Sequence, residues 1–330
     1  VQAVEQILPE KSLLDELAGK NGAGRYDYTE IAQPTLFALQ VGVTQMLRQR
    51  GITPVAVAGH SVGEIAAAWA SGALSLEQAV HVIYQRSRLQ GATKGKGRMT
   101  AFDLGEHAAR ELLEQVGLSP MLSVAGINSS NSVTVAGEIA ALETLEAALV
   151  ERKVLHKRLD LDYAFHSPAM DTIQADIVQA LADLSPGDTR IPFYSSVAGV
   201  RLDGTALRAD YWWRNIREPV RFEQTIKSIL AQGVKVFAEI GPHTLLRGYI
   251  GSCLRDEDIQ GQVIPTVLRD DDSPGRIWSA TCQIAIAGVP LDWKALFPRC
   301  GKFVQLPNYP WQRERYWHST HDIPADINVI

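Results

Sequence analysis

The sequence predicts an α/β fold, in which a core with a parallel sheet carries an inserted, ferredoxin-like α+β subdomain. Two patterns lead to this prediction. Before residue 97 and after residue 165, short apolar runs typical of buried strands alternate with amphipathic helical stretches. Between these parts the chain follows the order strand, helix, strand, strand, helix, strand. The length of 330 residues also exceeds what one hydrophobic core usually serves, so two folding units are expected.

The first part of the core is predicted to alternate between helices and a strand. Its expected elements are a helix over 31–50, a strand over 53–58, and helices over 64–71 and 76–89. Gly72 separates the last two helices, and Ser75 with Gln78 forms the capping box that starts the second one. Strands that are joined by helices in this way are typical of a parallel sheet.

The subdomain is expected to begin at a hinge, Gly95-Lys96-Gly97, because two glycines leave the backbone free to turn. Its expected elements are strands over 98–104, 122–128, 132–136 and 154–160 and helices over 106–116 and 140–152. The core then resumes, with helices over 170–184 and 222–232 and strands over 191–195 and 234–240. From residue 262 onward the regular patterns weaken. We therefore expect a discontinuous core at 1–96 and 166–255, a subdomain at 97–165 and a C-terminal extension at 256–330.

Composition excludes several classes of protein. The net charge is −5, no segment clusters Lys and Arg, and no apolar run approaches the roughly 20 residues that cross a bilayer, so neither a nucleic acid nor a membrane is an expected partner. The cysteines at 253, 282 and 300 are widely spaced and no signal segment is evident, which favours a reducing cytoplasm with buried, inert thiols. We expect no metal site. Because no initiating Met precedes Val1, we expect the chain to be a piece of a longer protein.

The strongest local signal is the turn Gly59-His60-Ser61-Val62-Gly63, which lies between an apolar strand and an Ala-rich helix. Such a turn lifts a serine oxygen clear of the backbone, and glycines are expected beside it because of strained dihedrals and close neighbouring strands. The helix that follows directs its N–H groups and positive dipole end at the turn, so Val62 N–H is the natural oxyanion donor. The alternative is a tight strand-to-helix turn without chemistry.

A nucleophilic serine needs a base, and eight histidines are available. His60 is adjacent to Ser61, so its side chain is expected to diverge from the hydroxyl. His166 is the better candidate, since it lies where the chain returns from the subdomain to the core, and we expect a cleft between the two at this crossing. His243 follows a strand and opens a helix, and its position fits a capping or packing role as well as a catalytic one.

Five motifs occur together along the chain. They are Gly59-His60-Ser61-Val62-Gly63-Glu64, Gln85-Arg86-Ser87-Arg88, Tyr163-Ala164-Phe165-His166-Ser167, Gly241-Pro242-His243 and Tyr309-Pro310-Trp311-Gln312-Arg313. In this order they resemble the acyltransferase domain of modular or iterative polyketide synthases, which are relatives of malonyl-CoA:acyl-carrier-protein transacylase. The resemblance covers nearly the whole chain. It implies a hydrolase-like core, and it makes the C-terminal extension similar to the linker that follows these domains.

The resemblance also implies roles for individual residues. It makes Ser61 the acylated nucleophile and His166 its base, without an acidic third member. A backbone carbonyl near the loop from Gly241 to His243 is implied to orient the imidazole, and the implied supporting residues are His60, Gln33, Gly241 and His243. Arg86 is implied to grip the free carboxylate of a malonyl-type acyl group, which a guanidinium can do with two hydrogen bonds. Taken alone, Arg86 would be a solvated helix charge like Arg88.

Selectivity for the α-substituent is expected to depend on Tyr163, Phe165 and Val62. Malonyl users of this family usually carry His-Ala-Phe-His and methylmalonyl users Tyr-Ala-Ser-His, whereas this chain has the mixture Tyr163-Ala164-Phe165-His166. The phenyl ring of Phe165 fills space that a serine would leave for a methyl branch, although one methyl group discriminates by only about 1–3 kcal/mol. Val62 stands where methylmalonyl users often have Gln. Malonyl-CoA is therefore favoured over methylmalonyl-CoA.

The resulting expectation is an acyltransferase that moves this acyl group from coenzyme A, through an acyl-serine, to the phosphopantetheine thiol of an acyl carrier protein. No bound cofactor is expected, and neighbouring ketosynthase and linker domains are the other expected partners. Two alternatives stay open: a serine esterase or thioesterase-type hydrolase, in which Asp160 or Asp162 would complete a triad, and an inactive structural fragment of a megasynthase.

One departure from the family pattern concerns the N-terminus. These domains open with a strand and a Gly-Gln-Gly-x-Gln turn whose glutamine N–H completes the oxyanion hole, and no such motif occurs here. The chain therefore looks N-terminally truncated. Because one oxyanion donor is worth on the order of 10²–10³ in rate, we expect the polypeptide alone to be weakly active or inactive.

Overall fold

The computed structural model describes residues 15–16, 25–269, 271, 273–299 and 301–314, which fall into two compact units, Val1–Leu296 and Phe297–Ile330. The described part of the second unit contains no helix or strand, and residues 301–314 are all exposed. The outer ends of the expected core and extension, at 1–14, 17–24 and 315–330, lie outside the described residues. No helix of the described part of the chain is long and apolar enough to cross a membrane.

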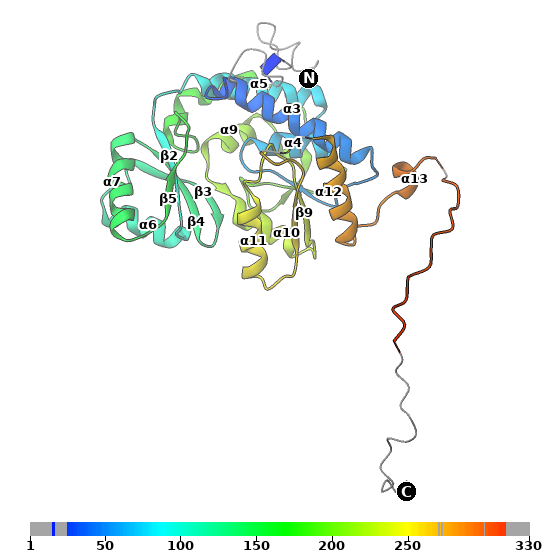
Figure 1. The fold of residues 1–330 in the computed structure, drawn as a ribbon. Coiled ribbons are helices and arrows are strands. Elements are labelled where there is room, and N and C mark those ends of the chain that lie inside the picture. The colour runs from blue at the N-terminus through cyan, green and yellow to red at the C-terminus, as the bar shows by residue number, and fades with distance from the viewer. Residues whose placement is uncertain (1–14, 17–24, 270, 272, 300, 315–330) are drawn as a thin grey trace, which may run out of the picture. The chain divides into compact units, whose positions relative to one another are not determined.

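The sheet of the expected subdomain, called the small sheet below, follows the predicted strand and helix order (Figure 1). Its elements are β2 (Arg98–Phe102), α6 (Glu106–Gln115), β3 (Leu122–Ser129), β4 (Ser132–Gly137), α7 (Ile139–Glu151) and β5 (His156–Arg158). The strands lie in the order β5-β2-β4-β3, and neighbours among them are antiparallel. Both helices pack on the sheet, where Leu112, Leu142 and Leu145 are buried against Val133 and Val135.

A fifth strand from a distant part of the chain completes this sheet. It is β8 (Val220–Arg221), which pairs parallel to β3 with Gly126 opposite Val220. The backbone just before β8 is therefore fixed against the small sheet, although it follows the core helix α9 (Ala209–Arg217).

The core contains two further sheets. Their strands are β1 (Val57–Ala58), β6 (Phe193–Tyr194), β7 (Arg201–Leu202), β9 (Val236–Glu239) and β10 (Gln262–Pro265). β1 pairs parallel to β6, β7 is antiparallel to β6, and β9 pairs parallel to β10. The predicted α/β class is thus confirmed. The strand expected over 53–58 is shorter than predicted, because Pro54 has no N–H to donate and Val55 is 71% exposed.

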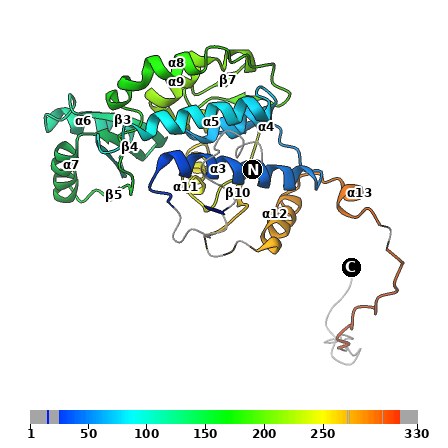
Figure 2. The ribbon, with the colours of Figure 1, turned by 90° about the horizontal axis from the view of Figure 1, so that it is seen from above.

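Helices surround these sheets. Before the small sheet they are α3 (Thr29–Arg48), α4 (Gly63–Ser71) and α5 (Leu76–Gly91), and after it α8 (Gln174–Ala180), α9, α10 (Phe222–Leu230), α11 (Arg247–Asp256), α12 (Pro274–Ile286) and α13 (Trp293–Leu296), with 3₁₀ turns η1 (Pro168–Ile173) and η2 (Gly204–Ala206). Figure 2 shows α3 beside α5, with α8 and α9 on the other side of α5. The capping box of Ser75 and Gln78 is present, and Gly72 ends α4 with φ of 89°.

Several sequence predictions are wrong. The helix expected over 170–184 is divided into η1 and α8, because the Ser167 side chain caps a turn that starts with Pro168. Regular structure does not weaken after residue 262, since β10 and α12 lie there. The thiols are not all buried: Cys253 is, but Cys282 lies on the outer side of α12 and is exposed. Cys300 lies outside the described residues.

Candidate active site

The nucleophile turn connects β1 to α4 and depends on one tight backbone approach. A Cβ atom at Gly59 would lie 2.2 Å from the backbone nitrogen of Glu64, so only glycine fits there. A Cβ at Gly63 would find its nearest neighbour, Gln40 Nε2, at 3.7 Å, which is ordinary contact. The expectation that both glycines are required is therefore wrong for Gly63. The unusual dihedral falls on Ser61 itself, whose φ is 51°.

His166 lies against Ser61. The Ser61 hydroxyl and His166 Nε2 are 2.7 Å apart, and His166 Nδ1 lies 2.8 Å from the carbonyl oxygen of Glu218. A carbonyl oxygen only accepts hydrogen bonds, so Nδ1 carries the proton and the bare Nε2 accepts the serine hydroxyl. The backbone N–H of His166 donates to the carbonyl of Ile216 at 3.2 Å, which holds the residue in its left-handed conformation with φ of 58°.

The carbonyl that orients the imidazole is not where the resemblance put it. It belongs to Glu218, at the end of α9, and not to the loop from Gly241 to His243. That loop follows β9, and Gln40 Nε2 donates to the carbonyl of Ile240 just before it at 3.2 Å. Because Gln40 also lies against Gly63, the loop is close to the nucleophile turn while His166 is held from another side.

The imidazole of His166 is almost entirely buried. Burial, with the nearby charge of Arg86 as the second cause, lowers its pKa to about 3. The ring is therefore neutral at pH 7, which is the state that a general base requires.

Arg86 projects from α5 and is also buried. Its Nη2 donates to Ser61 Oγ at 3.0 Å, its Nη1 to Gln33 Oε1 at 2.5 Å and its Nε to Asn215 Oδ1 at 3.3 Å. Burial lowers the pKa of Arg86 to about 9, so the guanidinium still carries its charge at pH 7. The structure thus brings Ser61, His166 and Arg86 into one hydrogen-bonded chain.

Sequence reasoning assigned no role in the site to two buried residues that adjoin these three side chains, Asn215 and Glu64. Asn215 of α9 donates to the carbonyl of Ser61 at 3.2 Å and to Glu64 Oε2 at 2.8 Å. The Glu64 carboxylate also accepts from the Tyr211 hydroxyl at 2.7 Å and from the backbone N–H of Ser196. Burial raises the pKa of Glu64 to about 7. A usable signal existed for Glu64 alone, as a carboxylate within an otherwise apolar, Ala-rich helix.

His60 points away from the nucleophile, as its adjacency to Ser61 predicts. Its Nε2 lies 2.9 Å from Asn128 Oδ1 on β3, and its ring packs edge-on against Phe222 with centroids 5.2 Å apart. Burial lowers the pKa of His60. His60 therefore ties the nucleophile turn to the small sheet.

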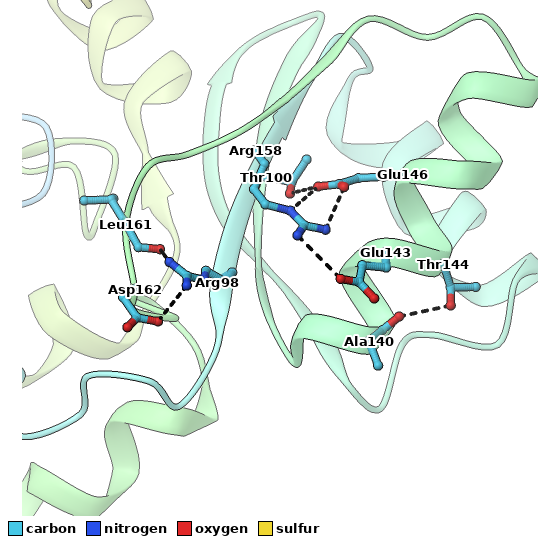
Figure 3. Close-up of polar contacts among 9 residues, drawn as sticks. All are labelled: Arg98, Thr100, Ala140, Glu143, Thr144, Glu146, Arg158, Leu161 and Asp162. Atoms are coloured by element: carbon cyan, nitrogen blue, oxygen red, sulfur yellow. Dashed lines mark hydrogen bonds and ion pairs between the residues drawn. The ribbon is translucent and has the colours of Figure 1, made fainter.

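Two of the three residues expected to set acyl selectivity lie just before His166, and the third, Val62, follows Ser61. The rings of Tyr163 and Phe165 stack, with centroids 4.9 Å apart and planes at 10°. Val62 and Phe165 pack against the same apolar core cluster. The segment leading to them is anchored on β2, where Arg98 binds the Asp162 carboxylate at 3.2 Å and the Leu161 carbonyl at 3.1 Å (Figure 3). Asp162 is thus engaged by Arg98 and does not complete a triad with His166.

A cavity of about 340 Å³ reaches His166 from the side of the small sheet. Its walls come from α6, β3 and the segment after α9, and they include Arg110, Arg217 and Pro219. Of the three hydrogen-bonded side chains, His166 alone lines this space. The predicted cleft beside His166 is therefore present, and neither Ser61 nor Arg86 lines it.

Comparisons with known proteins agree on one family. The family model described as "Acyl transferase domain" matches residues 3–289. Mycoketide-CoA synthase of Mycobacterium tuberculosis is 37% identical over 323 residues, which is 97% of this chain and 8% of that protein. Polyketide synthase GfsB of Streptomyces halstedii is 38% identical over 93% of this chain and 6% of its own length. The chain thus spans a small fraction of these curated relatives.

Solved structures give the same result. The acyltransferase domain from module 8 of the salinomycin polyketide synthase has a TM-score of 0.84 and 33% identity, covering 89% of this chain and 70% of that one. The loading acyltransferase from the avermectin modular polyketide synthase has a TM-score of 0.81 and 33% identity, covering 86% of this chain and 90% of that one.

Proposed function

Because this chain belongs to the acyl transferase domain family, we propose that it moves a malonyl-type acyl group from coenzyme A to the phosphopantetheine thiol of an acyl carrier protein. The single observation that carries the proposal is the continuous hydrogen-bonded chain from Arg86 through Ser61 to His166. These contacts support the proposed roles of Arg86 as the cation that binds the acyl carboxylate, Ser61 as the nucleophile and His166 as the neutral base. No bound cofactor takes part in the proposed reaction.

The proposed reaction has two half-reactions of the same form. His166 Nε2 takes the proton of the Ser61 hydroxyl while Oγ bonds to the thioester carbonyl carbon. The carbon–sulfur bond then breaks, and coenzyme A leaves with the proton from the imidazolium. In the second half the phosphopantetheine thiol gives its proton to Nε2 and attacks the acyl-serine, and Ser61 Oγ recovers a proton as it leaves.

The oxyanion that forms between these steps needs donors. Val62 sits at the start of α4 with helical dihedrals, and in the described part of the chain no group accepts a hydrogen bond from its N–H. This N–H and the positive end of the α4 dipole support the proposed role of Val62 as an oxyanion donor.

Arg86 has the donors that a carboxylate needs. A guanidinium carries five N–H groups, one on Nε and two on each terminal nitrogen. Among the described residues Asn215, Gln33 and Ser61 each occupy one nitrogen, which leaves one N–H on Nη1 and one on Nη2. A carboxylate can accept from both at once, which supports selection of acyl groups that carry a free carboxylate.

A hydrolase of the Ser-His-Asp type is a weaker candidate. In such an enzyme a carboxylate accepts from Nδ1 of the histidine. Here the acceptor is the Glu218 carbonyl, and Asp162 pairs with Arg98. The third possibility, a structural fragment within a megasynthase, predicts that Ser61→Ala has no measurable consequence.

For the α-substituent we propose malonyl over methylmalonyl, on the size of Phe165. Its ring is held by the stack on Tyr163, so it cannot easily turn away from a methyl branch. Phe165→Ser should raise the ratio of methylmalonyl to malonyl loading about 10-fold. An unchanged ratio would place the selectivity elsewhere.

The remaining partners follow from the relatives and are proposals as well. As part of a polyketide synthase the chain would work beside ketosynthase and linker domains. We also propose that residues 97–165 act as a distinct subdomain and that the segment from 256 onward serves as the linker-like extension.

The proposed function is tested with labelled malonyl-CoA, with and without a carrier protein that bears phosphopantetheine. Transfer predicts a labelled protein that persists until the carrier protein is added, and then labelled carrier protein. Immediate release of free malonate would identify a hydrolase. Ser61→Ala is the control, because it should remove both labelled products.

A further inference from the structure

One turn of backbone touches all three members of the proposed site. It runs from Asn215 to Glu218, over the end of α9 and its C-cap. The carbonyls of Ile216 and Glu218 hold the N–H and Nδ1 of His166, as described above. Asn215 supplies the remaining contacts, to the other two members.

The amide of Asn215 lies between Ser61 and Arg86. Its Oδ1 accepts from Arg86 Nε at 3.3 Å, and its Nδ2 donates to the Ser61 carbonyl at 3.2 Å. The second N–H of the same amide donates to Glu64 Oε2 at 2.8 Å. Both donors and the acceptor are thereby occupied, and the residue is only 1% exposed.

These contacts constrain the Ser61 backbone and the Arg86 guanidinium, on whose geometry the proposed reaction depends. The Ser61 backbone has a left-handed conformation that a serine rarely adopts, and a donor on its carbonyl helps to hold it. The Arg86 guanidinium is planar, so a bond to Nε fixes the direction in which the free N–H groups of Nη1 and Nη2 point. The amide also links the Arg86 cation to the Glu64 carboxylate.

We propose that Asn215 is a positioning residue that holds the Ser61 nucleophile and the Arg86 guanidinium in fixed positions relative to each other. It thereby determines the preference for carboxylated acyl groups. The claim about acyl preference rests on the function proposed above. The claim that Asn215 positions Ser61 holds for any acyl group.

The main test is Asn215→Leu, which keeps the size of the side chain and removes its polar atoms. Because the Arg86 guanidinium loses the hydrogen bond that orients it, the ratio of malonyl to acetyl transfer should fall by about 10-fold or more. Inactivation by phenylmethylsulfonyl fluoride, a neutral reagent for activated serines, should slow about 10-fold because Ser61 is no longer held. Asp210→Asn changes an exposed residue of the same helix and should leave both readouts unchanged.

Asn215→Asp is a second variant of the same shape. It still tests the proposal if Asn215→Leu fails to fold. It keeps an acceptor for Arg86 Nε but cannot donate to Ser61, and its charge opposes an incoming carboxylate, so both readouts should again fall. Equal losses of malonyl and acetyl transfer, with normal sulfonyl fluoride reactivity, would overturn the proposal. If the wild-type protein loads no malonyl group, the proposed function fails, whereas the sulfonyl fluoride rate still tests the hold of Asn215 on Ser61.

Discussion

The carbonyl oxygen of Glu218 accepts the Nδ1 proton of His166 at 2.8 Å. A carbonyl fixes the orientation and tautomer of the ring as a carboxylate would, but it brings no full negative charge. Burial and the Arg86 charge lower the pKa of His166 by more than the hydrogen bond to Glu218 raises it, so the pKa stays low, at about 3.

This relationship predicts how His166 titrates. The imidazole should remain neutral, with its proton on Nδ1, from about pH 5 to about pH 8, because its pKa lies well below this range. Nuclear magnetic resonance of isotope-labelled histidine measures this, and His166→Gln identifies the signal by its disappearance. A titration of this signal near the ordinary histidine value would contradict the prediction.

Arg86→Ala tests the carboxylate clamp. Malonyl transfer should fall by about 100-fold or more in kcat/KM, since the acyl carboxylate loses both free donors, whereas acetyl transfer should be largely spared. Arg88 lies on the same helix but is exposed, so Arg88→Ala is the matched control. Steady-state kinetics with the two thioesters decides, and an equal loss for both acyl groups would refute the clamp.

The two glycines of the nucleophile turn should respond differently to a methyl group. Gly59→Ala places Cβ against the backbone of Gly63 and Glu64, so it should destabilise the protein by about 3 kcal/mol or more. Gly63→Ala has room for its Cβ and should change stability by less than about 1 kcal/mol. Urea unfolding measures both free energies. Similar effects at the two positions would contradict the close approach of Gly59 to the backbone of Gly63 and Glu64.

Glu64 should make stability depend on pH. In the unfolded chain its carboxyl loses the proton near its ordinary value of 4.5, whereas burial raises the folded pKa to about 7. The folded state therefore binds more protons between these values, and the stabilising contribution is lost as the pH rises through this window. Relative to Glu64→Gln, the wild-type protein should lose roughly 3 kcal/mol of unfolding free energy from about pH 4.5 to about pH 7.5.

Urea unfolding at several pH values checks this prediction. Glu77 is an exposed carboxylate whose pKa is lowered by hydrogen bonds from its own backbone N–H and from Ser75. Because a lowered pKa places the titration of Glu77 below this range, the difference in unfolding free energy between wild type and Glu77→Gln should stay nearly constant, which makes this variant the control. A difference between wild type and Glu64→Gln that stays constant across the range would rule out a buried, titrating Glu64.

Local patterns were sufficient to predict the parts of the site that are local in sequence. The turn around Ser61 is bounded by its own strand and helix, and Ser75 caps α5 within three residues. Four strands of the small sheet are also local, because they and their helices follow one another without interruption from β2 to β5. Such elements carry their own turn, cap and periodicity signals.

The parts that sequence reasoning missed depend on long-range contacts. Asn215 meets Ser61 across 154 positions of sequence, and Glu218 acts through a backbone carbonyl that no side-chain pattern can reveal. The strand β8 is only two residues long, too short for a period-2 signal. The resemblance correctly anticipated a carbonyl on the imidazole, but it assigned the loop of Gly241 to His243, which also lies near the turn.

The central claim is that Ser61 carries a carboxylated acyl group that Arg86 and His166 help to load. Intact-protein mass spectrometry after mixing with malonyl-CoA, methylmalonyl-CoA and acetyl-CoA together, followed by peptide mapping, tests it most directly. The account predicts the mass gain of a single malonyl group on the peptide containing Ser61, and no gain in Ser61→Ala. A group on another residue, or acetyl loading that equals malonyl loading, would contradict it.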